Sequence, residues 1–87
     1  MQLAELKAQW NDVLNHLESH NRIAWMAFFD ARLAALEAGV LTLDFRDASK
    51  LAGAHDIKAS VSSAHQEQLI ESIHVITGYH VQILLSA

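Results

Sequence analysis

The sequence contains no cysteine and no proline, and only 3 of its 87 residues are glycine. Without cysteine the chain has no disulfide, no thiolate metal ligand and no thiol nucleophile. Small secreted domains usually need disulfides, so the absence of cysteine favours a reducing compartment, and we expect a cytoplasmic protein. The scarcity of glycine also excludes a glycine-rich phosphate-binding loop.

Charged residues are few as well, at 18% of the chain, and the six lysines and arginines are scattered singly along it. Nucleic-acid phosphates are bound by clustered basic side chains, so we expect no direct contact with DNA or RNA. No apolar run approaches the roughly 18 to 20 residues that span a bilayer, and the first residues do not read as a signal peptide. We therefore expect no association with a membrane.

Hydrophobic residues, by contrast, make up 52% of the sequence, which is ample material for a core. A chain of 87 residues has room for only one core, because domains cluster around roughly 100 to 150 residues. Residues 1–87 are therefore predicted to form a single domain.

Two helices are predicted in the first third of the chain. Large apolar residues recur at spacings of three and four from Leu3 to Leu17, which is typical of an amphipathic helix. Residues 19–21 supply capping side chains. A second apolar run, Ile23 to Ala31, predicts a helix buried on much of its circumference, and the two helices should pack as a hairpin.

The apolar period then changes to two, which predicts two strands. They cover residues 33–36 and 40–45 and are joined by a turn at residues 38–39. Thr42 and Asp44 fall on one side of the second strand, which should be at least partly wet. The other side should meet the helices and carries Leu41, Leu43 and Phe45.

The last third predicts a helix and a strand. Residues 47–55 can form a short helix or an ordered turn, and residues 56–61 show no clear pattern. Ser62 or Ser63 can cap a helix that reaches about Thr77, and Gly78 is placed to end it. Residues 79–85 then alternate as a strand. The apolar stripe of the helix consists of Leu69, Ile70, Ile73 and Ile76.

The predicted order is helix, helix, strand, strand, a variable piece, helix and strand. Helices lie on both sides of the hairpin in the sequence, and the last strand must join the same sheet. This order predicts an α+β fold, a two-layer sandwich in which a three-stranded sheet carries helices on one face.

Histidine is the residue type that raises the question of a metal. His16 and His20 share one helical face, and His74 and His80 could meet across a helix and the strand after it. No third ligand has a diagnostic spacing, so we expect no metal site. The carboxylates and serines are spaced like solvating charges and caps, so we expect no catalytic residue and no cofactor. A small metal-dependent enzyme that uses some of these four histidines remains an alternative hypothesis for the function.

Aromatic and apolar residues that escape the predicted core suggest a surface for a protein partner. All aromatic residues except Phe29 and Tyr79 fall on predicted inward faces. With Leu84, these two are the predicted partner surface. An unpaired strand edge would also permit a homodimer without requiring one.

Four short segments, made mostly of core positions, form a pattern along the chain: Trp10-x2-Val13-Leu14-x2-Leu17, Asn21-Arg22-x2-Trp25, Leu36-x2-Gly39-Val40-Leu41-Thr42-Leu43-x-Phe45 and Thr77-Gly78 before an alternating strand. Together they resemble the C-terminal domain of the bacterial DNA polymerase III gamma/tau subunit, especially of the actinobacterial type. The resemblance covers nearly the whole chain and is weakest between residues 47 and 62.

The resemblance implies a KH-like fold of order α-α-β-β-(α)-α-β. It also implies a domain at the C-terminus of a larger parent chain, attached by a flexible linker to the clamp-loader ATPase. The domain would tether the clamp loader to the catalytic subunit of the polymerase, with the replicative helicase as a further partner. It would not be an enzyme itself, because the ATPase motifs are absent. Nor is RNA binding implied, since residues 53–56 break the GxxG loop that KH domains use.

A second family shares much of this pattern. It is the N-terminal domain of the bacterial chromosomal replication initiator, for which self-association and helicase binding would be implied. That domain usually carries a Pro-Asn-x-Phe-like turn after its second strand. Residues 46–49 here contain neither proline nor asparagine, and this departure favours gamma/tau.

Overall fold

The computed structural model describes residues 1–44 and 63–86 of the chain. The described elements, in chain order, are α1 (Leu3–His20), α2 (Arg22–Phe28), β1 (Arg32–Glu37), β2 (Val40–Asp44), α5 (Ser63–Thr77) and β3 (Gln82–Ser86). This order confirms the predicted α+β fold. The expectations for Phe45, for a short helix or turn in residues 47–55 and for the broken loop at residues 53–56 lie outside the described residues.

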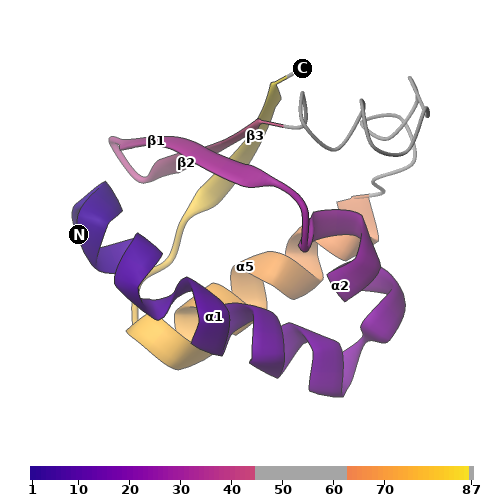
Figure 1. Ribbon diagram of the computed structural model, residues 1–87. Coiled ribbons are helices and arrows are strands. Elements are labelled where there is room, and N and C mark those ends of the chain that lie inside the picture. Colours follow the sequence, from indigo (N-terminus) through magenta and orange to yellow (C-terminus); the bar gives the residue numbers. More distant parts are fainter. Residues whose placement is uncertain (45–62, 87) are drawn as a thin grey trace.

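The strands form one sheet in the order β1-β2-β3, in which β1 is antiparallel and β3 parallel to the central β2. A parallel pair requires a crossover connection, and α5 lies on that connection. Figure 1 shows α1, α2 and α5 all on the same side of the sheet. The two-layer arrangement predicted from the element order is therefore confirmed.

α1 forms as its apolar spacing predicts. Its fully or almost fully buried residues follow a three-and-four spacing along one face. At its start, the Glu5 carboxylate accepts a hydrogen bond of 3.1 Å from the backbone N–H of Gln2. Asn21 marks its end and also caps α2, since the Asn21 side chain accepts a bond of 3.1 Å from the N–H of Ala24. The buried residues of α1 are Leu6, Trp10, Val13 and Leu17.

α2 is shorter and less buried than the sequence predicts. It ends at Phe28 and not at Ala31, because the chain turns through residues 29 and 30 to enter β1. The N–H of Ala31 bonds to the carbonyl of Phe28, which closes that turn, and Ala31 packs in the core outside the helix. Within α2 only Ala24 and Phe28 are buried. An apolar run without glycine or proline contains no signal for the helix end.

The turn between β1 and β2 lies at the predicted residues. Glu37 pairs with Val40, so the loop consists of Ala38 and Gly39, both with positive φ, at 52° and 75°. Two-residue hairpin loops favour this backbone because its twist matches that of the strands.

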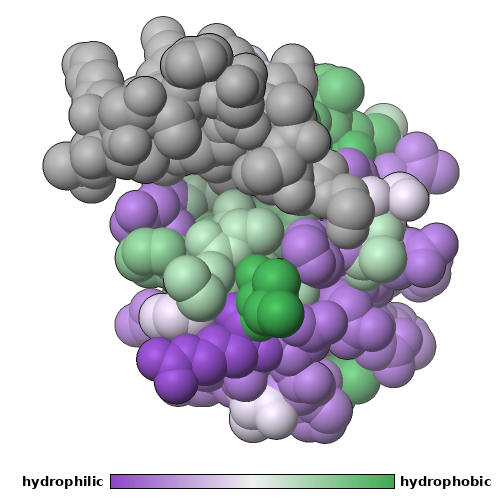
Figure 2. All heavy atoms as spheres, turned by 90° about the vertical axis from the view of Figure 1, so that its right-hand side faces the viewer, coloured by the Kyte–Doolittle hydropathy of each residue, from purple (hydrophilic) through white to green (hydrophobic). Residues whose placement is uncertain are grey.

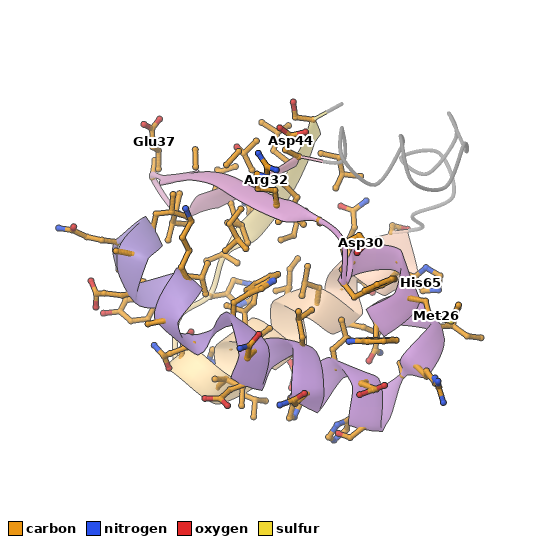
Figure 3. All side chains as sticks on the ribbon, in the orientation of Figure 1. Met26, Asp30, Arg32, Glu37, Asp44 and His65 are labelled. Carbon is orange, nitrogen blue, oxygen red and sulfur yellow. The ribbon has the colours of Figure 1, made fainter. Side chains whose placement is uncertain are left out.

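The two faces of the sheet agree with the predicted alternation, with one exception. Leu41 and Leu43 point into the helical layer and are completely buried. Thr42 lies on the opposite face and is half-buried. Asp44 lies on the same face as Thr42 but is only 7% exposed, so the prediction that it is partly exposed to solvent was wrong. Its direct cross-strand neighbour is Arg32 (Figure 3). Alternation predicts the side on which a residue lies but not what packs against it.

The last strand also begins later than predicted. β3 starts at Gln82, and residues 79–81 form a linker after Gly78, whose φ is 80°. The Tyr79 N–H bonds to the Thr77 hydroxyl at 3.1 Å, and the Gln82 N–H bonds to the Gly39 carbonyl at 2.8 Å. The hydroxyl bond holds Tyr79 against the end of the helix, so pairing in the sheet begins only at Gln82.

Candidate protein-interaction surface

The largest exposed apolar side chains of the described residues include three on one side of α2. Ile23 is 68% exposed, Met26 61% and Phe29 45%. We call these three residues the α2 face. Figure 2 shows the side of the molecule on which α2 lies, where green hydrophobic atoms gather below the grey region and are bordered by purple hydrophilic atoms.

The spacing of these residues explains why they share one face. Ile23, Met26 and Phe29 follow one another at intervals of three residues. At about 100° per residue, each step moves the side chain back by about 60°, so the three span about 120° of the helix. Phe29 lies just past the last helical residue but keeps helical backbone angles, φ −61° and ψ −28°. Ala24 and Phe28 occupy the other side and anchor α2 in the core.

Phe29 is further positioned by an aromatic neighbour. The ring of Trp25 stacks on that of Phe29 with centroids 4.9 Å apart and planes inclined by 22°. Trp25 itself is half-buried and packs against the core. A stacked pair of this kind restricts the rotamers of an exposed ring, so less entropy is lost when a partner covers it.

The three predicted surface residues are all exposed, but they do not form one surface. Tyr79 is 48% and Leu84 55% exposed. Phe29 follows α2, which contacts α5 and lies next to the first turns of that helix in Figure 1. Tyr79 follows the opposite end of α5, about 20 Å away along a helix of this length. Leu84 pairs with Thr42 and so lies on the sheet face away from the helices.

Sequence reasoning therefore found Phe29 but missed Ile23 and Met26. It assigned both to a helix buried on most sides. A signal was present in the sequence, since the small residues within α2, Ala24 and Ala27, mark the side on which α2 approaches its neighbours. A short helix can bury only one side against a layer of other helices, so the remaining apolar residues must face outward.

His16 and His20 of α1 stack on each other, and their Nδ1 atoms contact other groups of the chain. The rings of His16 and His20 stack at 4.1 Å and 23°. The Nδ1 atom of His16 lies 2.9 Å from the Ser72 hydroxyl, and that of His20 lies 2.9 Å from the carbonyl of His16. Both Nδ1 atoms are thus engaged within the chain. The His16–Ser72 pair links α1 to α5, and Ser72 is only 2% exposed.

His74 and His80 also meet, as the sequence suggested they could. Their centroids lie 5.9 Å apart in an edge-to-face arrangement. Within residues 1–44 and 63–86, no group of three or more histidines, cysteines, aspartates or glutamates is placed to hold a metal ion.

The chemistry that these described residues offer is apolar contact on the α2 face. None of the described helices is long and apolar enough to cross a membrane. Comparison of the chain with protein-family models, with curated proteins and with solved structures gave no match.

Proposed function

We propose that this chain is a protein-interaction domain of the bacterial replication machinery, which tethers the clamp loader to the catalytic subunit of the replicative polymerase. The replication assignment depends on the sequence pattern shared with the gamma/tau subunit. The interaction role depends on one structural observation, the exposure of Ile23, Met26 and Phe29 on a single face of α2. The proposal gives this domain no reaction and no cofactor.

The α2 face has the properties of a contact site for another protein. Large apolar side chains cost free energy when they remain in water, at about 25 cal/mol per Å² of apolar surface. The two buried anchors, Ala24 and Phe28, hold the helix in place whether or not a partner is present. The catalytic subunit would therefore meet a surface that is already formed, which favours binding.

The experiment is a calorimetric titration of the purified chain with the catalytic subunit of the polymerase. Saturable binding is expected. Met26→Glu should weaken it at least about tenfold, because a charge would be buried in an apolar contact. Val75→Glu is the matched control, since Val75 is exposed to a similar degree, 53%, but lies on α5.

Two results would contradict the proposal. Absence of binding by a folded chain would exclude the tether and make the replicative helicase the next partner to test, as the initiator resemblance implies. Equal losses in Met26→Glu and Val75→Glu would exclude the α2 face as the binding site.

A further inference from the structure

The two edges of the sheet differ in how they are protected against further strand pairing. Among the described residues, β1 and β3 each pair with β2 on one side only. β1 begins with Arg32, ends with Glu37 and shifts register between Leu33 and Ala35. Charged residues and such irregularities make an edge strand unsuitable for pairing with another chain. β3 contains no charged residue and no proline, and it pairs with β2 without a register shift. We call the side of β3 that faces away from β2 the β3 edge.

The backbone of β3 presents hydrogen-bonding groups along this edge. In a parallel pair, alternate residues of a strand direct their N–H and C=O groups to the same neighbour. The Gln82 N–H bonds to the Gly39 carbonyl at 2.8 Å, which fixes the alternation. Gln82 and Leu84 therefore direct their backbone groups toward β2, and Ile83 and Leu85 direct theirs to the β3 edge. This row of donors and acceptors has the spacing of another extended backbone.

The side chains of β3 are also less covered than those of the central strand. Ile83 and Leu85 face the helices, as their partners Leu41 and Leu43 do. Leu41 and Leu43 are completely buried, whereas Ile83 and Leu85 are only partly buried. Leu84, on the outer face of the sheet, is 55% exposed. A strand beside β3 would therefore cover apolar surface on both faces of the sheet.

We infer that the β3 edge binds an extended segment of another protein, which joins the sheet as a further strand. The backbone of that segment would bond to Ile83 and Leu85, and its alternate side chains would meet the partly buried side chains on one face and Leu84 on the other. In this kind of recognition the main-chain bonds supply affinity and the alternate side chains supply specificity.

Charge indicates what kind of segment fits. The chain has a formal net charge of −4, so two copies of it repel each other, and β3 itself carries no charge to offset this repulsion. An apolar segment flanked by lysine or arginine is instead attracted. The β3 edge belongs to the sheet, whereas the α2 face belongs to the helical layer, so the inference does not depend on the proposed tether.

The test is a selection against the purified, folded chain from a library of random linear peptides of about ten residues, which is long enough to form a strand. Selected peptides should have apolar residues at alternate positions and basic residues at their ends. When a selected peptide is titrated into the isotope-labelled chain, the amides of Ile83 and Leu85 should shift most and exchange more slowly with solvent. Failure to select any peptide, or shifts centred away from β3, would overturn the inference.

Two pairs of variants test whether the edge itself binds. Ile83→Pro removes the N–H at the β3 edge but no bond to β2, and edge strands tolerate proline at such positions. It should bind a selected peptide at least about tenfold more weakly than Ile83→Val, which keeps the N–H. Leu84→Lys adds a charge that blunts the edge and should also weaken binding. Val75→Lys is its matched control, because Val75 is 53% exposed but lies on α5.

Circular dichroism checks that each variant folds, and the Leu84→Lys pair tests the edge even where Ile83→Pro does not fold. Equal affinities of Leu84→Lys and Val75→Lys, or of folded Ile83→Pro and Ile83→Val, would overturn the inference. So would a chain that uses β3 only to pair with its own copies. Met26→Glu should leave peptide binding unchanged, so failure of the β3 edge and failure of the tether are distinguishable.

Discussion

α1 and α2 are both rich in apolar residues but use them differently. Every large apolar residue of α1 is buried in the core or packs against it. α2 places Ala24 and Phe28 in the core and leaves Ile23 and Met26 among the most exposed apolar side chains of the described residues. Burial in the core accounts for every large apolar residue of α1 but for only some of those of α2. Large apolar side chains that stay exposed in this way mark a contact surface.

The largest expected effect is on the inner side of α2 itself. Phe28 is completely buried, so Phe28→Ala should lower the free energy of unfolding by about 4 kcal/mol, from lost burial and the cavity left behind. Urea denaturation followed by circular dichroism measures this loss. A loss below about 1 kcal/mol would mean that α2 does not depend on its core anchor.

A core substitution in α1 should have the next largest effect. Leu17 is completely buried, and Leu17→Ala should cost about 3 kcal/mol. The same denaturation experiment applies, with Leu14→Ala as a matched control because Leu14 is only partly buried. Equal losses of unfolding free energy in Leu17→Ala and Leu14→Ala would show that the buried face of α1 has been assigned to the wrong residues.

A smaller effect is expected where α1 is joined to α5 by a polar contact. His16→Ala, Ser72→Ala and the double variant form a cycle around the 2.9 Å contact between Nδ1 and the hydroxyl. The coupling energy should be about 0.5 to 1 kcal/mol, as for an ordinary hydrogen bond that replaces contacts with water. Strictly additive losses would indicate that the two side chains do not interact in solution.

The smallest effect on stability is expected on the outer side of α2. Met26→Ala should change the free energy of unfolding by no more than about 0.5 kcal/mol, because Met26 is 61% exposed and alanine is a good helix former. The same variant should weaken binding of a partner to the α2 face. A loss of stability comparable to that of Leu17→Ala would mean that Met26 belongs to the core and would remove the difference between the two helices.

The sequence predicted the fold where apolar spacing is regular. The three-and-four spacing of α1 and the turn at Ala38 and Gly39 were both predicted at the observed residues. The predicted C-terminal helix likewise begins at Ser63 and ends at Thr77. In these regions one side of each element is apolar and the other polar, so the pattern itself determines which side is buried.

The sequence was less informative where every side is apolar or where burial depends on distant segments. The run that contains α2 has no polar side, so neither its end nor its exposed face follows from periodicity. Asp44 was predicted to be wet but is buried, because its surroundings come from tertiary packing. Phe29, Tyr79 and Leu84 were correctly expected to be exposed, but only the arrangement of the layers shows that they lie on separate parts of the molecule.

The most direct test of the central claim, that the outward side of α2 is a binding surface, is a titration of the isotope-labelled chain with the catalytic subunit of the polymerase, followed by backbone amide spectra. We expect the first and largest shifts at Ile23, Met26 and Phe29, with residues of α5 near Val75 unaffected. Shifts centred on Val75, Tyr79 or Leu84, or no shifts at all in a folded chain, would contradict it.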